Sequence, residues 1–521
     1  MFSWFTIWAA DLRSRQGWRS YRASLLYGAL AALSFPPFNA FFALWFCFPA
    51  VIFLLQGATS WRAAFATGWF FSFGMLTISL YWIAGSLFVD IKQFWWLVPF
   101  AVAGLPALLA LYYAVATLVG WYWGLKRYDG VLFLALSWFL ADYARGHLFT
   151  GFPWDLVGHA WADILPVLQI TSVIGIYGLS LVTLLLIVLP ATLVAPVRTR
   201  YSTQIFIISL LFLAGLFGWG HWRLTNASDA VVADVRLRLV QSDLQQSHKW
   251  RSEERERNFQ QLLNVTFAPA KKPITHIIWP ETATALYLTE DKQHRKIIAA
   301  RMPKGAGLLT GVVRRGVRPD GSLVYFNSLI ALNDRGNVVA GYDKVHLVPF
   351  GEYIPFRSFI PIPAIATLGT DFTAGEGLYT MRVPGLPPFS PLVCYEVIFP
   401  DKVIEVGDTP QFMVNVTNDG WYEHTTGPYQ HFAIARVRTI EEGMPLVRVA
   451  NKGVVAVIDA YGRSKAQFGW GWAGFVDSDL PQPVAGLTFY SHHRNMILWI
   501  LLGAVSVFIC MLRFLITSRI R

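Results

Sequence analysis

Charged side chains are scarce in this sequence: Asp, Glu, Lys and Arg together make up 14% of its 521 residues. Because soluble globular proteins average about 25% charged residues, this deficit excludes a chain that is soluble along its whole length. Cysteine is also scarce, with three residues and no CxxC pair or Cys/His cluster. That pattern gives no indication of a zinc site, and we expect neither a metal nor a cofactor.

The hydrophobic residues, 55% of the chain, are concentrated in two regions. Long apolar runs occupy residues 23–222, one more covers 496–515, and the stretch between them has ordinary polarity. We therefore predict three parts. They are an N-terminal membrane domain (1–222) with about seven transmembrane helices, a water-exposed domain (223–494), and a C-terminal transmembrane helix with a short tail (495–521).

About eight membrane spans are predicted, because a helix needs roughly 20 apolar residues to cross a bilayer core of about 30 Å. The first two predicted spans are short and are separated by Pro36 and Pro37, which leaves open a hairpin that does not cross fully. The predicted spans are 23–38, 41–56, 63–88, 94–124, 131–147, 164–196, 203–222 and 495–514.

Basic residues in the short loops predict the orientation, because Lys and Arg gather on the cytoplasmic side. If the N-terminus is cytoplasmic, only Lys92 and Arg145 lie in outside loops. Both termini are then cytoplasmic and domain 223–494 is extracytoplasmic, which in a bacterial inner membrane means periplasmic. The same asymmetry accounts for the net charge of +11 without nucleic-acid binding. The inside set is Arg13, Arg15, Arg19, Arg22, Arg62, Lys126, Arg127, Arg198, Arg200, Arg513, Arg519 and Arg521.

Domain 223–494 alternates short β-branched runs with helical stretches, which indicates a layered α/β domain. Periodicity does not give the order of its strands. Helices are predicted at 253–265, 292–302 and 429–442. Strands are predicted at 235–241, 275–279, 308–313, 328–332, 392–395, 412–415, 446–449 and 454–458.

Several polar residues follow directly after the apolar strands. Glu281 ends HIIWPE, Cys394 and Glu396 end PLVCYE, and Asn418 and Asp419 end MVNVTND. Ligand sites in open α/β sheets gather where strands end, so we expect these groups near one another. Cys394 is the only cysteine of this domain, so a free and reactive thiol is expected there.

These residue types together suit nucleophilic catalysis. A cysteine attacks as the thiolate, and its ordinary pKa is about 8.5, so it needs a base or a positive neighbour. Glu281 could take the thiol proton. Lys344, in GYDKVHLVPFGEY, could stabilise the oxyanion of a tetrahedral intermediate and favour the thiolate. Glu352, eight residues further on, could orient Lys344 or share its proton.

The segments WPETA, DKVHLVPFGEYIP and CYEVIFP resemble the Glu-Lys-Cys triad of the nitrilase (carbon–nitrogen hydrolase) superfamily. The stretch that begins TNDGWYEHTTGPYQHF, together with the flanking spans, resembles the apolipoprotein N-acyltransferase family. The resemblance implies an αββα nitrilase-like sandwich joined to an α-helical transmembrane bundle. It also implies that Glu281 is the general base, Lys344 the oxyanion stabiliser and Cys394 the nucleophile.

The same resemblance implies further roles and partners. Glu352, Tyr395 and Glu396 match supporting residues of the family, and Trp250 in QQSHKW matches a substrate-loop tryptophan. The implied donor is a phospholipid, usually phosphatidylethanolamine, and the acceptor is the N-terminal amine of an S-diacylglyceryl-cysteine apolipoprotein. The implied reaction, by way of a cysteine thioester, is the final step of bacterial lipoprotein maturation. A monomer is expected.

Purely structural roles for the two additional acidic residues stay open, and so do rival functions. Glu352 could only hold a loop together, and Glu396 could be a buried structural acid paired with an arginine. A membrane-tethered amidase or nitrilase-type hydrolase could use the same triad with water as the acceptor. A transporter or scaffold with an inactive domain is the other rival, but few intramembrane charges are visible beyond Asp142 and Arg145.

Overall fold

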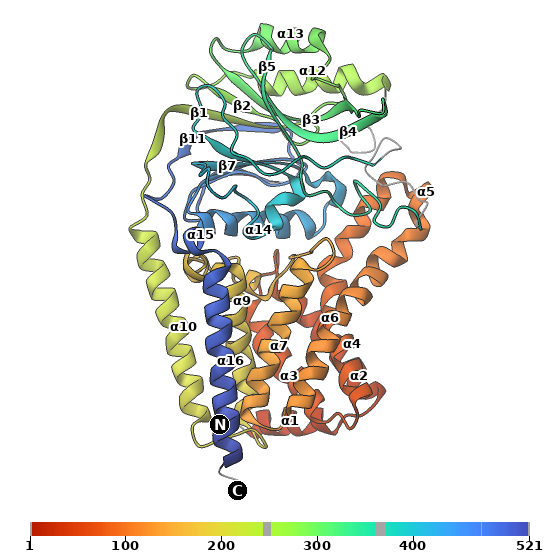
Figure 1. Ribbon diagram of the computed structural model, residues 1–521, viewed down its shortest axis with the longest axis vertical. Coiled ribbons are helices and arrows are strands. Elements are labelled where there is room, and N and C mark those ends of the chain that lie inside the picture. Colours follow the sequence, from red (N-terminus) through yellow and green to blue (C-terminus); the bar gives the residue numbers. More distant parts are fainter. Residues whose placement is uncertain (1–2, 243–251, 360–370, 470, 519–521) are drawn as a thin grey trace. The chain divides into compact units, whose positions relative to one another are not determined.

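The computed structural model describes residues 3–242, 252–359, 371–469 and 471–518 (Figure 1). It divides into two compact units. The helical unit comprises Met1–Ala84, Trp96–Asn226 and Thr488–Arg521, and the α/β unit comprises Gly85–Trp95 and Ala227–Leu487.

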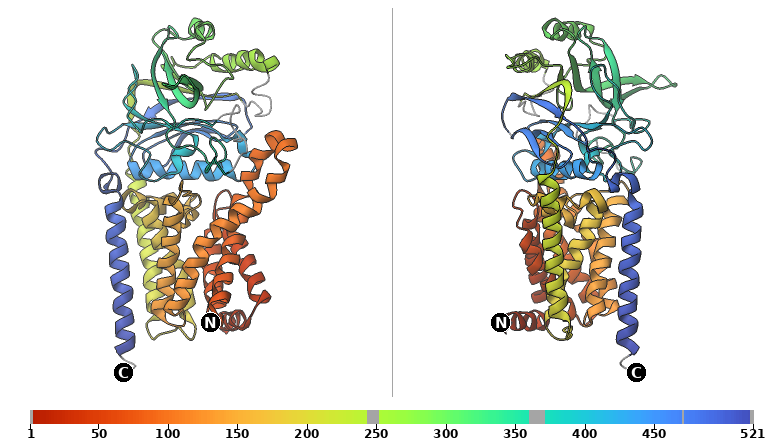
Figure 2. Two further views of the ribbon diagram at one scale, coloured as in Figure 1. Left: turned by 45° about the vertical axis from the view of Figure 1, so that its right-hand side comes forward. Right: turned by 90° about the vertical axis from the view of Figure 1, so that its left-hand side faces the viewer.

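The helical unit consists mainly of apolar helices (Figure 2). Its helices end at recognisable signals. The Ser60 hydroxyl accepts a hydrogen bond from the Ala63 N–H at the start of α4, and Gly124 adopts a left-handed conformation after α6. The helices are α1 (Ser3–Ser14), α2 (Trp18–Ala31), α3 (Leu44–Gln56), α4 (Trp61–Leu80), α6 (Leu105–Trp123), α7 (Tyr128–His147), α8 (Leu165–Leu168), α9 (Thr171–Val188), α10 (Ser202–Thr225), α15 (Phe489–His493) and α16 (Asn495–Ser518).

Five helical segments among the described residues are long and apolar enough to cross a membrane, so the chain is a membrane protein. The three other predicted spans are also helical, but they differ in length or composition. Helices α2 and α3 have 14 and 13 residues, and α7 contains Asp129, Asp142 and Arg145. The five segments are Trp61–Leu97, Phe100–Trp123, Thr171–Leu193, Ser202–Thr225 and Asn495–Phe514.

The charged pair of α7 has a structural explanation. Arg145 and Asp142 form an ion pair of 3.3 Å, and both side chains are buried. Arg145 also donates to the Tyr113 hydroxyl at 2.8 Å and to the carbonyls of Phe152 and Trp154 at 2.8 and 2.7 Å. This pair therefore fastens the segment after α7 to the helices, and its charges give no support to a transport pathway.

The α/β unit contains two sheets, with strand orders β11-β1-β2-β3-β4-β5 and β10-β9-β8-β7-β6 (Figure 1). The strands are β1 (Val231–Gln241), β2 (His276–Ile278), β3 (Gly307–Val317), β4 (Leu323–Leu332), β5 (Val338–Asp343), β6 (Phe389–Val393), β7 (Phe412–Asn418), β8 (Leu446–Asn451), β9 (Val455–Ile458), β10 (Ser464–Phe468) and β11 (Gly474–Pro481). The helices are α5 (Ile91–Phe94), α12 (Arg255–Thr266), α13 (Lys292–Arg301) and α14 (Gly427–Glu442).

The two sheets face each other across one apolar core. Leu239 of β1 and Leu309 of β3 share a buried cluster with Val414 of β7 and Val449 of β8. A second buried cluster fills the space between the other face of the six-stranded sheet and helices α12 and α13. Helix α14 lies against the outer face of the five-stranded sheet (Figures 1 and 2). This is a layered αββα sandwich, as the resemblance to nitrilases implies.

Gly311 of the six-stranded sheet allows the backbone of the segment after β2, which carries Glu281, to approach β3 closely. A Cβ atom on Gly311 of β3 would lie 2.5 Å from Glu281 Cα, 2.6 Å from Thr282 N and 2.8 Å from the Pro280 carbonyl oxygen. These are backbone atoms, which cannot move aside as a flexible side chain can. Only glycine therefore lets β3 and the segment after β2 approach this closely.

We predict that Gly311→Ala lowers the free energy of unfolding by about 1–3 kcal/mol, the usual cost of overpacking a core. Gly341→Ala in β5 is the matched control, because its Cβ would meet no atom closer than 3.6 Å. Thermal unfolding of both purified variants in detergent measures the difference. Equal midpoints for the two variants would contradict the predicted clash.

Candidate active site

Three predicted site residues come from the ends of strands in both sheets. Glu281 follows β2 and Lys344 follows β5 of the six-stranded sheet, whereas Cys394 follows β6 of the five-stranded sheet. All three side chains are buried. The fold therefore brings an acid, a cation and a thiol, distant in sequence, to one buried place between the sheets.

A buried asparagine connects the two acidic residues. Asn327 of β4 donates through Nδ2 to Glu281 Oε1 at 2.6 Å and to Glu352 Oε1 at 2.8 Å. Glu352 in turn forms an ion pair of 2.8 Å between its Oε2 and Lys344 Nζ. Sequence reasoning missed Asn327. The available signal was an amide within FNSLIAL, a strand whose other residues are apolar except for Ser328.

Glu352 combines the two roles that the sequence leaves open. Besides its ion pair with Lys344, its Oε2 accepts from the Val348 backbone N–H at 2.8 Å. Its own N–H donates to the Val348 carbonyl at 2.8 Å. One carboxylate thus closes the loop and holds the ammonium group.

Cys394 has an unusual backbone conformation. Its φ is +55°, in the left-handed region that a residue with a Cβ rarely adopts. It stands where β6 ends and a short 3₁₀ helix, Cys394–Ile398, begins. Such a conformation costs on the order of 1–3 kcal/mol and persists only where the surroundings enforce it. Strained positions of this kind cluster at functional sites.

The charges of the three residues act on one another. Burial and the negative charge of Glu281 raise the pKa of the Cys394 thiol, and the Lys344 ammonium opposes them only in part. Burial alone would lower the pKa of Lys344. The charges of Glu352, Cys394 and Glu281 outweigh burial, so the Lys344 pKa lies above its ordinary value. Both shifts favour the protonated forms, a thiol at Cys394 and an ammonium at Lys344.

Glu396 fastens two loops together. Its Oε1 accepts from the Tyr342 hydroxyl at 2.8 Å and from the N–H groups of Val345 and His346 at 2.7 and 3.1 Å. Its Oε2 accepts from the Val393 N–H at 2.7 Å. These partners are a tyrosine and backbone amides, so pairing with an arginine was the wrong structural alternative. The contacts join the segment of Lys344 to the turn of Cys394.

The last two predicted site residues are Tyr395, which the structure describes, and Trp250, which it does not. Tyr395 is buried, and its ring packs against His346 and Phe399 with centroids 5.8 and 5.1 Å apart. Trp250 lies outside the described residues, so its assignment stays a prediction.

The residues after β7 also lie at this place, as the strand-end argument predicts. Asp419 is buried and pairs with Arg448 at 2.8 Å and His431 at 2.9 Å. Burial tends to raise its pKa, but the charge of Arg448 and the hydrogen bond with His431 keep that pKa below its ordinary value. The Thr417 hydroxyl donates to Asp419 Oδ1 at 3.2 Å.

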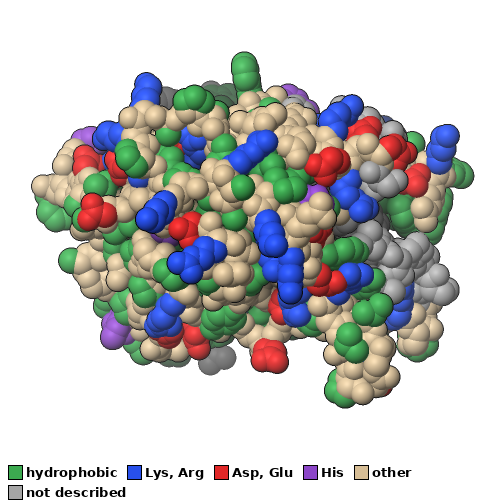
Figure 3. Space-filling model, turned by 90° about the horizontal axis from the view of Figure 1, so that it is seen from above, with side chains coloured by type: hydrophobic (Ala, Val, Ile, Leu, Met, Phe, Trp, Pro, Cys, Tyr) green, Lys and Arg blue, Asp and Glu red, His purple; other side chains and the backbone are tan. Residues whose placement is uncertain are grey.

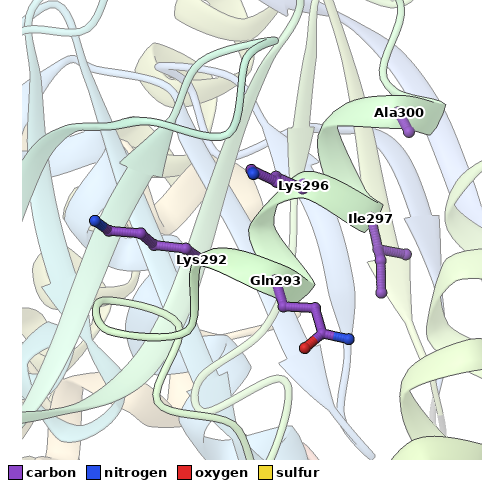
Figure 4. A pocket seen from close by; sticks show the side chains of 5 residues that line it. All are labelled: Lys292, Gln293, Lys296, Ile297 and Ala300. Carbon is purple, nitrogen blue, oxygen red and sulfur yellow. The ribbon is translucent and has the colours of Figure 1, made fainter.

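Surface features of the α/β unit offer no comparable chemistry. Seen from above, Lys and Arg side chains alternate with Asp and Glu, as on a solvated surface (Figure 3). A pocket along α13 is lined by Lys292, Gln293, Lys296, Ile297 and Ala300, and so carries no acid or thiol (Figure 4). Within the part of the chain that the structure describes, no group of three His, Cys, Asp or Glu side chains could hold a metal.

Comparisons with known proteins agree over nearly the whole chain. Residues 27–189 match the family model of the apolipoprotein N-acyltransferase N-terminal domain, and residues 236–487 match that of carbon-nitrogen hydrolases. The apolipoprotein N-acyltransferase of Rhodopseudomonas palustris is 38% identical over 489 residues, covering 90% of this chain and 91% of that protein. The one of Brucella melitensis is 40% identical over 490 residues with the same coverage. Among solved structures, an amidase from Nesterenkonia sp. matches at 19% identity and a TM-score of 0.36, over 52% of this chain and 98% of that one.

The electrostatics predict opposite effects of two substitutions on alkylation of Cys394. Glu281→Gln removes a charge that raises the thiol pKa, so the thiolate fraction at pH 7 and the alkylation rate rise. Lys344→Met removes a charge that lowers the same pKa, so the rate falls. Each pKa unit is worth tenfold, and we expect changes of roughly three- to tenfold.

The measurement is the rate of iodoacetamide labelling as a function of pH, in a background of Cys47→Ser and Cys510→Ser. Parallel slowing in both variants would show that the charges of Glu281 and Lys344 do not govern the thiol. Gly341→Ala in the same background is the control, because it changes a residue of the same domain without changing a charge.

Proposed function

Because the chain belongs to the apolipoprotein N-acyltransferase family, we propose that it transfers a fatty acyl chain from a phospholipid to the N-terminal amine of an S-diacylglyceryl-cysteine apolipoprotein. The acyl chain passes through a thioester on Cys394. One observation carries the proposal: this thiol lies on a left-handed turn where the charges of Glu281 and Lys344 both act on it.

In the first half-reaction, Glu281 takes the thiol proton and the sulfur attacks the ester carbonyl of the phospholipid. The tetrahedral oxyanion is stabilised by the Lys344 ammonium and the Tyr395 backbone N–H. The raised pKa of Lys344 keeps it cationic throughout. Collapse of the intermediate breaks the ester C–O bond, and the leaving lysophospholipid takes the proton from Glu281. Phosphatidylethanolamine is the proposed donor.

In the second half-reaction, the apolipoprotein amine attacks the thioester carbonyl and loses a proton to Glu281. The C–S bond breaks, an amide forms, and the Cys394 thiol is restored with that proton. A thioester is reactive enough to acylate an amine without ATP. Two products leave in separate steps, so the scheme predicts ping-pong kinetics.

The remaining residues hold this arrangement in place. Glu352 keeps Lys344 charged and aimed, and Glu396 ties the lysine segment to the cysteine turn. Tyr395 contributes its N–H, and Trp250 contacts the substrate. No step requires a metal or cofactor.

Both substrates are lipids, which suits an enzyme embedded in a membrane. We infer that the chain is a monomeric multi-pass protein of the bacterial inner membrane, with its α/β unit in the periplasm and both termini in the cytoplasm. The charge asymmetry of the short loops supports this orientation.

The rival within the same chemistry is an amidase, in which water replaces the amine. Family membership over both parts of the chain favours the transferase. Product analysis separates the two, since an amidase releases the free fatty acid even when a lipoprotein amine is supplied.

Incubation with phosphatidylethanolamine is predicted to add one acyl mass to the intact protein. Hydroxylamine should remove the added mass, because it cleaves thioesters, and Cys394→Ala should show none. Intact-protein mass spectrometry makes the measurement. An acyl mass that persists in Cys394→Ala would place the intermediate elsewhere and sink the proposal.

We further predict that Cys394→Ser fails to complement a strain deficient in lipoprotein N-acylation. Glu281 and Lys344 are placed to activate a thiol, and a serine hydroxyl is far less acidic. Growth equal to that of wild type would show that a thiolate is not required.

The orientation is tested with single cysteines at two exposed positions, in a background lacking Cys47, Cys394 and Cys510. Ser228→Cys in the α/β unit should react with a membrane-impermeant maleimide in intact spheroplasts. Ser14→Cys at the end of α1 should react only after lysis. The reverse pattern would invert the topology.

A further inference from the structure

The backbone carbonyl of Cys394 is held by a side chain that the reaction scheme does not use. Asn415 of β7 donates through Nδ2 to the carbonyls of Leu392 at 3.2 Å and Cys394 at 3.3 Å. His431, on α14, contacts Asp419 Oδ1 through Nδ1 at 2.9 Å. Asn415 and His431 are both fully buried.

The register of β7 tells which way this carbonyl points. Val414 and Val416 belong to the core between the sheets. Because neighbouring side chains of a strand point to opposite faces, Asn415 points to the other face, where α14 and His431 lie. The Cys394 carbonyl is thus drawn toward α14.

The next N–H must then point the other way. In a trans peptide the carbonyl and the N–H are antiparallel. Drawing the Cys394 carbonyl toward α14 turns the Tyr395 N–H toward the space between the sheets, the side from which Glu281 and Lys344 come. That N–H is the backbone donor assigned to the oxyanion.

The orientation of the Asn415 amide is itself fixed. Arg448 of β8 donates through Nη1 to Asn415 Oδ1, so the Nδ2 group is left to face the two carbonyls. Arg448 is held in turn by Asp419, whose Oδ2 accepts from Nη2 at 2.8 Å. Arg448 and Asp419 are both fully buried, so solvent does not weaken this pair.

We propose that Asn415 is a positioning residue for acyl transfer: by holding the Cys394 carbonyl, it aims the Tyr395 N–H at the oxyanion. The Arg448–Asp419 pair keeps the amide from turning over. The inference rests on the thioester chemistry proposed above and adds a residue to it.

The test compares two reactions of the same thiol. Acylation by phospholipid passes through an oxyanion, whereas alkylation by iodoacetamide displaces iodide and forms none. In Asn415→Ala, acylation by phosphatidylethanolamine should slow by about 10- to 100-fold, less than the 10²–10³ lost with an oxyanion donor itself. Alkylation should stay near the wild-type rate.

Asn415→Thr provides a second variant that keeps the strand packed. Threonine suits β-strands, and its hydroxyl is too short to bridge both carbonyls, so the same selective loss is expected. Asn258→Ala is the matched control, because it removes a buried amide from α12 and leaves β7 intact. Thermal unfolding is measured for each protein.

If acylation and alkylation fall together, Asn415 serves only folding and the proposal is overturned. Unchanged acylation in both variants overturns it as well. An absence of acylation in the wild-type protein is a different result, because it removes the thioester chemistry itself.

Discussion

The ion pair between Lys344 and Glu352 is the interaction on which the rest of the site depends. A buried ammonium without a partner would lose its charge to desolvation. The 2.8 Å contact with Glu352 prevents this, and Asn327 links that carboxylate to Glu281. The result is a positive charge held at the place where the proposed reaction forms its oxyanion, inside a buried site. Such preorganised charge is worth far more there than on a surface.

Sequence reasoning succeeded where residue type and local pattern carry the information. Apolar runs marked the helices, and strand ends marked Glu281, Cys394 and Asp419. The eight predicted strands are all present, because most are short apolar runs and 235–241 alternates apolar with polar residues. Strands β5, β10 and β11 were missed. SKAQF and GFVDSDLP are polar and partly exposed, so their pairing is decided by neighbouring strands rather than by their own composition.

The local sequence pattern could not identify the supporting residues of the site, for a different reason. Asn327 and Asn415 act through carbonyls and carboxylates that are distant in sequence, and only the register of the strands brings them together. Glu396 was recognised as an acid, but its partners are backbone amides, which carry no mark in a sequence. The number of membrane crossings was also difficult to predict from the sequence. Helices α2 and α3 are shorter than their apolar runs, because Pro36 and Pro37 separate them.

The division of the site between two sheets has a consequence for how the chain matures. The cation and the base are delivered by one sheet and the sulfur by the other, with the apolar core between them. A nascent domain in which only one sheet has formed holds either a harmless thiol or a pair of charges with nothing to activate. In the proposed mechanism, reactivity toward lipid esters therefore requires both sheets to have formed and packed together, so a chain with one sheet incomplete would not attack the bilayer around it.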